Sequence, residues 1–153
     1  TVTAGNASGL NDAAAALLLM DREVAEAQGR PVMARLVDYT VVGVDPKYMG
    51  IGPVPAINQI LERNGLSVTD IDVYEVNEAF AAQALAVAQQ LDLPTDRLNP
   101  NGSGISLGHP IGATGAVVTV KALHELARVN GRYAMVSLCI GGGQGIAALF
   151  ERG

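Results

Sequence analysis

The chain has 153 residues, a formal net charge of −5, 49% hydrophobic residues and 16% charged residues. This length suits one domain that buries about two thirds of the surface of its unfolded chain, and the acidic balance excludes the basic patch that nucleic acid requires. The longest apolar run, Ala13 to Met20, is far shorter than the roughly 20 residues that cross a bilayer, so no membrane span is expected. The single cysteine, Cys139, cannot form an internal disulfide and no signal peptide is recognisable, which favours a reducing, cytoplasmic compartment.

The first predicted elements are a helix and a strand. Capping residues precede an apolar stretch with periodic charges, which predicts a helix over residues 10–28 with Ser8 as its N-cap. Gly29 and Pro31 end that helix, because neither continues helical backbone well. Residues 32–44 alternate in polarity and are rich in β-branched side chains, which predicts a strand.

Two further helices flank a short strand. Apolar residues recur at helical spacing from Val54 to Leu61, before the helix-ending pair Asn64-Gly65, and predict an amphipathic surface helix. Residues 71–76 predict a strand. The apolar residues 77–91 predict a helix that is buried on several sides.

The last third of the chain contains a helix and two strands. After a glycine-rich loop, residues 114–129 predict a helix, residues 133–140 a buried strand, and residues 146–150 a strand antiparallel to it. The order of elements predicts an α/β fold, with a mixed β-sheet covered by helices on both faces. Chemistry in such folds is expected at the strand-to-helix junctions.

One glycine motif suggests a dinucleotide site. Gly143, Gly145 and Ala148 form a G-x-G-x-x-A string after a predicted strand. That fingerprint requires a helix after the loop. A strand-like segment follows here instead, so a nicotinamide cofactor is not expected.

The stretch NPNGSGISLGHPIGATG, residues 99–115, places five glycines around His109. A glycine loses much conformational freedom on folding, so such a loop indicates sharp turns or close approaches. Three glycines are expected to bend the loop so that the histidine points into a narrow site: Gly102, Gly104 and Gly108. Two are expected to let the next helix pack closely: Gly112 and Gly115. A histidine held in this way can be a general base or an oxyanion donor, although a purely structural histidine is the alternative.

Two other side chains lie at the ends of predicted strands. Cys139 precedes IGGGQG, whose bare backbone N–H groups can approach a carbonyl oxygen, and a thiol beside such donors suits proton transfer at an acyl carbon. An inert core thiol is the alternative. Asn77 can position a water or simply cap the following helix, with Glu78 in its first turn. His124, on the charged side of a helix, is expected to be solvated.

Three motifs resemble, in order and spacing, the C-terminal signature motifs of thiolases: NEAFA at 77–81, the glycine-rich stretch at 99–115, and CIGGGQG at 139–145. Residues 3–20 and 42–53 are also similar to that family, in particular to bacterial acetyl-CoA acetyltransferases and β-ketothiolases. The resemblance implies the C-terminal half of a thiolase, a βαβαβαββ unit. It assigns residues 1–153 to the C-terminal domain, with residues 1–8 as the end of the preceding loop domain.

The resemblance also implies a role for each motif. His109 would activate a nucleophilic cysteine and contribute to a first oxyanion hole, which a water held by Asn77 completes. Cys139 would be the acid/base that moves the α-proton and exchanges a proton with the CoA thiol. The backbone N–H of Gly141 would belong to a second oxyanion hole. Three residues match positions that line the pantetheine channel or the acyl pocket: Ser8, Met49 and Phe80. The implied substrates are acyl-CoA and CoA, with no metal and no permanently bound cofactor.

The family's nucleophilic cysteine lies in the N-terminal half, and Cys139 is the only cysteine here. The implied partners are therefore that N-terminal half, with the loop domain that grips the charged end of CoA, and further copies in dimers that pair into tetramers. The start at Thr1, without an initiator methionine, fits a piece of a longer protein, and the isolated chain is expected to be inactive.

Two other function classes stay open. Ketoacyl synthases share the fold but have a second histidine or an asparagine where thiolases have the cysteine of CIGGG, so Cys139 disfavours them. The chain could also be a non-catalytic dimerisation or scaffold module.

Overall fold

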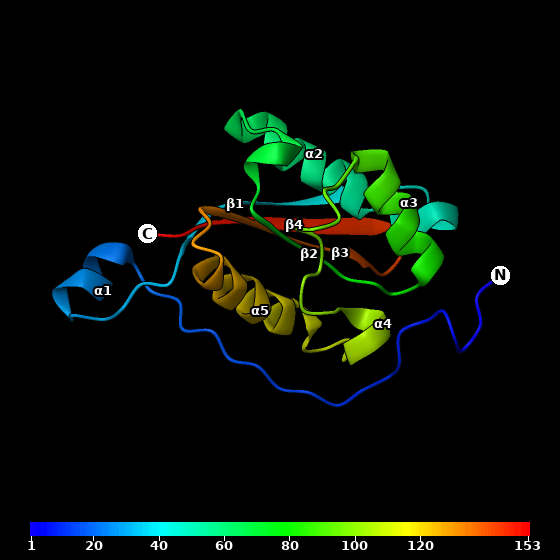
Figure 1. Cartoon of the computed structure of the whole chain (residues 1–153), viewed down its shortest axis with the longest axis horizontal. Helices are drawn as coiled ribbons and strands as arrows, with labels where there is room; N and C mark the ends of the chain where they lie inside the picture. Colours follow the sequence, from blue (N-terminus) through cyan, green and yellow to red (C-terminus); the bar gives the residue numbers. More distant parts are fainter.

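The computed structural model describes all 153 residues and is built around one four-stranded sheet. Its strands are β1 (Arg35–Gly43), β2 (Val73–Val76), β3 (Tyr133–Ile140) and β4 (Gln144–Glu151). They lie in the spatial order β1-β4-β3-β2, with β2 parallel to β3 and β4 antiparallel to both of its neighbours. The predicted mixed sheet is thus confirmed (Figure 1).

Helices cover both faces of this sheet, as predicted. The helical segments are α1 (Arg22–Ala27), η1 (Pro46–Ile51), α2 (Pro53–Asn64), η2 (Val68–Asp70), α3 (Ala81–Leu91), α4 (Gly104–Leu107) and α5 (Thr114–Arg128). Figure 1 shows α2 and α3 on one side of the sheet and α5 on the other. Two apolar clusters correspond to these layers, one around Ile57, Ile60 and Met135, the other around Val118 and Leu126. No helix is both long and apolar enough to span a membrane.

The chain order follows the expected βαβαβαββ pattern, with one element reduced. The third strand position is occupied by Leu98, which makes a single parallel bridge to Tyr74 on β2. The loop after Leu98 therefore leaves the sheet at the same edge as the end of β2. This connection brings the glycine-rich segment to the carboxyl ends of the strands.

The predicted helix over residues 10–28 is wrong over most of its length. Only Arg22–Ala27 is helical, and its N-cap is Asp21, which accepts from Glu23 N at 2.9 Å, rather than Ser8. Residues 10–20 lack regular secondary structure and run past α4 and α5 as an open chain (Figure 1). Leu10 is 88% exposed and Leu18 80% exposed. Most helical stability in proteins comes from packing an apolar face, and these side chains have no such partner within this chain.

The prediction for residues 77–91 needs a second correction. Helix α3 begins only at Ala81, and its buried residues lie on one face: Gln83, Val87 and Leu91. Leu85 is 62% exposed, so the helix is not buried on several sides. The reason is that α3 packs on α2 and η1 at the end of the sheet, which leaves its outer face free.

Candidate active site

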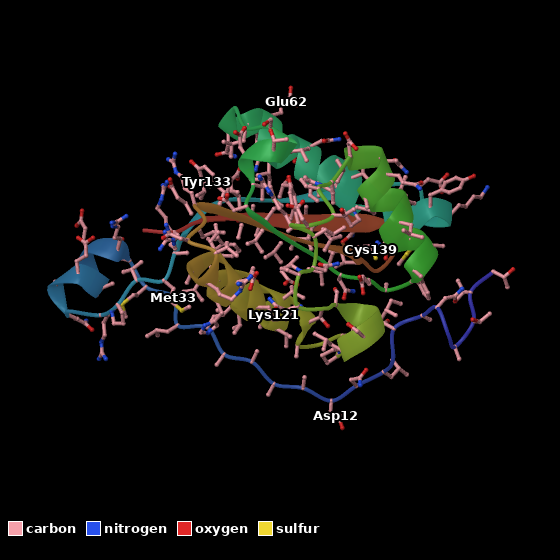
Figure 2. The ribbon with its side chains drawn as sticks, in the orientation of Figure 1. Asp12, Met33, Glu62, Lys121, Tyr133 and Cys139 are labelled. Atoms are coloured by element: carbon pink, nitrogen blue, oxygen red, sulfur yellow. The ribbon has the colours of Figure 1, made fainter.

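The ends of two parallel strands bring Asn77 and Cys139 to the same edge of the sheet. Val76 pairs with Ser137, and the backbone N–H of Asn77 donates to Ser137 O at 3.0 Å. Cys139 lies two residues further along β3, opposite Gly145 on β4. Figure 2 labels Cys139 at the end of the sheet next to the start of α3. Asn77 thus lies at the junction between β2 and α3, and Cys139 at the end of β3 before the turn into β4.

The side chain of Asn77 is buried and has no partner. Its exposed fraction is 1%, and neither Oδ1 nor Nδ2 makes a hydrogen bond. Three residues separate it from Ala81, where α3 begins, and the N-cap is Phe80, so the capping role is wrong. A buried amide without partners costs about 1–3 kcal/mol for each unpaired group. Such an amide is suited to hold a water or a substrate atom.

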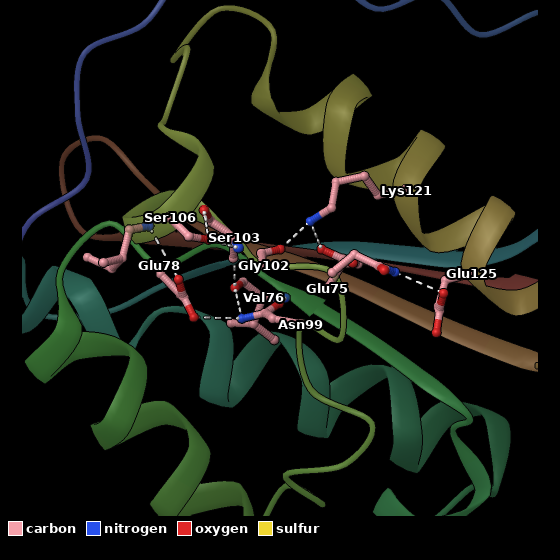
Figure 3. A network of polar contacts seen from close by, with 11 residues as sticks. Glu75, Val76, Glu78, Asn99, Gly102, Ser103, Ser106, Lys121 and Glu125 are labelled. Carbon is pink, nitrogen blue, oxygen red and sulfur yellow. Dashed lines mark hydrogen bonds and ion pairs between the residues drawn. The ribbon is translucent and has the colours of Figure 1, made fainter.

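The glycine-rich loop closes directly over Asn77. A Cβ on Gly104 would lie 2.5 Å from Glu78 O and 3.0 Å from Asn77 Oδ1, so only glycine fits there. Asn99 fastens the start of the loop to β2, since its amide accepts from Val76 N and donates to Val76 O, both at 2.9 Å. Glu78, outside the helix, accepts from Asn99 Nδ2 and Ile105 N, each at 3.3 Å (Figure 3).

The other four glycines of the loop fall into two pairs, which differ in backbone conformation and in the space around them. Gly102 and Gly108 have φ values of 79° and 100°, which confirms that they make turns that other residues rarely adopt. A Cβ on Gly112 or Gly115 would meet nothing within 4 Å, so the packing role expected for these two is wrong within this chain.

The ring of His109 is fixed by a hydrogen bond at Nδ1. Its Nδ1 lies 2.7 Å from Thr114 Oγ1, and the hydroxyl of Thr114 donates to Pro110 O at 2.9 Å. When the single proton of the Thr114 hydroxyl is donated to Pro110 O, the hydroxyl accepts from the histidine, which places the ring proton on Nδ1 and leaves the Nε2 lone pair free. Burial lowers the pKa of His109 below its ordinary value and favours the neutral ring. A neutral imidazole with a free Nε2 has the form of a general base.

The segment that contains Ser8 connects His109 to the start of α3. Ser8 N donates to Ala79 O at 2.9 Å, and His109 N donates to Gly9 O at 3.0 Å. Ala7 and Phe80 form an antiparallel bridge beside these bonds. His109 also lines a cavity of about 320 Å³ together with Leu10, Asn11, Asp12 and Ile111. Ser8, Phe80 and His109 are thus parts of one surface.

Cys139 is a buried free thiol, 7% exposed. Burial raises its pKa, so the proton stays on sulfur at neutral pH. The following Gly141 is exposed, and a Cβ there would meet nothing within 4 Å, which leaves open space beside its backbone. A protonated thiol next to an open glycine turn can give a proton to a bound molecule.

Met49 lies in η1, which packs against the same end of the sheet. Gly52, just after η1, contacts Gly145 backbone to backbone, with no room for a Cβ on either residue. Gly50 lies against Gln83 on α3, where a Cβ would be 2.7 Å from the glutamine Cγ. Because Gly52 contacts Gly145, the cross-strand partner of Cys139, the nearby half-buried Met49 lies at the same end of the sheet as Cys139.

The sequence did not identify three of the residues that shape this site. Thr114, Asn99 and Glu78 act through hydrogen bonds rather than through a reactive group. Thr114 follows the histidine by five residues at the start of a helix, a spacing that could have indicated the contact. Glu78 was interpreted as a first-turn residue, and its bonds to the loop depend on a fold that local sequence does not reveal. His124, as expected, is exposed.

Comparisons with known proteins give a consistent result. Residues 30–152 match the family model "Thiolase, C-terminal domain". The "Beta-ketothiolase BktB" of Cupriavidus necator is 70% identical over 152 residues, which are 99% of this chain and 39% of that protein. The crystal structure of the Bacillus anthracis acetyl-CoA acetyltransferase superposes with a TM-score of 0.96 at 56% identity, over 99% of this chain and 38% of that one. Human mitochondrial 3-ketoacyl-CoA thiolase in complex with CoA gives 0.92 at 47% identity, over 99% and 39%.

The chain thus spans 38–39% of the length of these relatives. The family match covers most of its length, including all the strands and the segments that carry Asn77, His109 and Cys139. The chain belongs to the thiolase family, as a thiolase C-terminal domain.

Proposed function

We propose that this chain is the C-terminal catalytic half of an acyltransferase that joins acetyl-CoA and an acyl-CoA into a 3-ketoacyl-CoA and CoA, or runs the reaction in reverse. The observation that supports this most is that an unpaired buried amide, Asn77, and a buried thiol, Cys139, lie at the ends of neighbouring parallel strands, with the loop that leads to His109 packed on the amide. The names of the relatives, a β-ketothiolase and an acetyl-CoA acetyltransferase, agree with this activity.

In this proposal His109 is the base of the first acyl transfer. Its Nε2 takes the proton from a cysteine thiol of the N-terminal half as the sulfur bonds to the thioester carbonyl carbon. The new Nε2–H then donates to the oxygen that becomes negative, and a water on the amide of Asn77 donates from a second direction. Carbonyl reformation expels the leaving group and leaves an acyl-cysteine.

Cys139 balances the protons of both steps. In condensation, the first step expels CoA as a thiolate, which takes the proton of Cys139 and leaves a Cys139 thiolate. That thiolate then removes an α-proton from the second acetyl-CoA, and the carbanion attacks the acyl-cysteine. The raised pKa of the Cys139 thiol favours the protonated starting form that this order requires.

The remaining predicted site residues serve binding. Gly141 N–H donates to the thioester oxygen of the second substrate as the α-carbon loses its proton, which stabilises the enolate. Ser8 and Met49 line the channel for the pantetheine chain, and Phe80 the acyl pocket. Their positions around the strand ends, on η1 and on the segment beside α3, support these roles. Coenzyme A thioesters are thus substrates and not permanently bound cofactors.

A partner surface supports the need for an N-terminal half. Residues 10–20 are open and largely apolar, and Tyr39 and Val41 on the edge strand β1 are 65% and 53% exposed. An apolar cavity of about 570 Å³ lies between residues 16–20 and α5. Exposed apolar area of this kind marks an interaction surface. We infer that the N-terminal half covers it and supplies the nucleophilic cysteine and the grip on the charged end of CoA.

The proposal extends to the setting of the whole enzyme. The domain boundaries are residues 1–153 for the C-terminal domain, with residues 1–8 as the end of the loop domain. The enzyme forms dimers that pair into tetramers and works in the cytoplasm, where a catalytic thiol stays reduced. The free, unpaired Cys139 is compatible with that compartment.

Acetoacetyl-CoA thiolysis tests the function. The assay compares this chain alone with a chimera in which it replaces the matched 152 residues of the 70% identical relative. The chain alone is expected to be inactive and the chimera active. Activity of the chain alone would mean that Cys139 serves as the nucleophile and would overturn the division of roles. A folded but inactive chimera would favour a non-catalytic docking module.

A further inference from the structure

Strand β2 carries a carboxylate into the interior of the protein. Glu75 is 0% exposed, and its Oε2 accepts from Lys121 Nζ on α5 at 2.8 Å, while Oε1 has no partner. The side chain of Lys121 is itself only 18% exposed. Removing two charges from water often costs as much as their contact returns, so a buried ion pair is weak evidence for stability. This pair therefore calls for another explanation.

Lys121 makes a second contact, to the glycine-rich loop. Its Nζ also donates to Gly102 O, as Figure 3 shows. One turn later on α5, Glu125 accepts from Asn101 Nδ2 at 2.8 Å. Helix α5 thus binds two successive residues of the loop, and Lys121 joins that loop to β2 through Glu75.

The loop held in this way covers Asn77 and leads to His109. Gly104 follows Gly102 by two residues and lies against the amide of Asn77, where even a methyl group would not fit. Glu75 precedes Asn77 by two residues on β2 and its following turn. The ammonium group of Lys121 therefore links β2, which leads to Asn77, with the glycine-rich loop, which leads to His109.

We propose that Lys121 and Glu75 are positioning residues, which hold the glycine-rich loop at the height over β2 at which His109 Nε2 and the Asn77 amide face the same substrate oxygen. The inference rests on the proposed function and names two residues that touch no substrate. A misplacement of about 1 Å in a catalytic arrangement can lower a rate by about 100-fold. Loss of one anchor out of several is expected to produce a comparable or smaller effect.

The test uses the chimera with both partners replaced by residues of similar volume, Glu75→Met/Lys121→Met, and with Lys121→Met alone. Apolar replacement of a whole buried pair commonly preserves stability, whereas the single change leaves a buried carboxylate unpaired. The matched control is Arg63→Met on α2. Like Lys121, Arg63 donates to a carboxylate, Asp38, and to a backbone carbonyl, Tyr39 O, but it lies away from the loop.

We expect the double variant to melt near the parent temperature while its kcat falls about 10- to 100-fold and its KM for acetoacetyl-CoA changes less than about threefold. The control should keep its kcat within about twofold. A double variant that melts like the parent and has parental kcat would overturn the proposal, because the pair would then be structural only.

A variant that retains the charge covers the case in which the double variant does not fold. Lys121→Arg keeps donors for Glu75 and Gly102, so its kcat should exceed that of Lys121→Met at least about tenfold. Equal kcat values in these two single variants would contradict the proposal. If the parent chimera is inactive, the proposed function itself is contradicted. If the parent chimera and the double variant are equally active, only the positioning role of Lys121 and Glu75 is contradicted.

Discussion

Replacement of Thr114 by valine in the chimera should slow the enzyme without unfolding it. Valine has nearly the shape of threonine but lacks the hydroxyl that accepts from His109 Nδ1 at 2.7 Å. An N–H left without a partner in a half-buried position costs about 1–3 kcal/mol. The ring can escape that cost by rotating or by moving its proton to Nε2, and either change removes the free lone pair from the site. At 1.4 kcal/mol for each factor of ten, kcat/KM should fall about 10- to 100-fold.

The assay is acetoacetyl-CoA thiolysis, with the rate of acyl-enzyme formation measured by rapid mixing. Thr114→Ser is the matched control, because serine keeps the hydroxyl and should stay within about threefold of the parent. The melting temperature of each variant reports the loss of the bond from Thr114 to Pro110 O separately. A valine variant as fast as the parent, or a serine variant as slow as the valine variant, would refute the tautomer assignment.

Two further predictions concern the loop and its histidine. Gly104→Ala should lower both the melting temperature and the activity, because its Cβ would lie 2.5 Å from Glu78 O. The control is Gly112→Ala, whose Cβ would meet nothing within 4 Å and which should leave the melting temperature of the chain nearly unchanged. Equal effects of the two substitutions would contradict the close approach of the loop over Asn77. Burial lowers the folded-state pKa of His109, so the neutral ring should persist below pH 6.5 and the acid limb of acyl-enzyme formation should lie below that pH. Stability should be lost as the pH falls from about 6.5, the unfolded-state pKa, to the lower folded-state pKa, because only the unfolded chain binds the proton in that range. A His109→Asn variant should lose that pH dependence of stability, and an acid limb above pH 6.5 would argue against a buried neutral base.

Local sequence was sufficient for the elements whose side chains meet partners within this chain. The β-branched residues of β1, the apolar run of β3 and the Gly65 end of α2 all appear in the structure close to their predicted bounds. The strand-to-helix junction after Val76 and the turn after Ile140 bring the predicted site residues to one edge. These elements could be predicted because strand patterns and glycine turns are determined over a few residues.

The failures have a common physical cause in missing or distant partners. Residues 10–20 have the composition of a buried helix, but no surface of this chain covers them, so hydrophobic content alone did not produce a helix. Helix α3 exposes Leu85 for the same reason. Lys121 and Glu75 are 46 residues apart, and only the packing of α5 beside β2 brings them together. Such contacts have no local signature.

Exchange of the α-protons of acetyl-CoA with solvent tests the central assignment most directly. In D2O the chimera should introduce deuterium into the methyl group of acetyl-CoA, and mass spectrometry measures the deuterium content over time. In the Cys139→Ser variant, which keeps the shape but lacks an acidic thiol, that exchange should fall at least about 100-fold. Exchange at the parent rate in this variant would show that another group moves the α-proton and would contradict the role of Cys139.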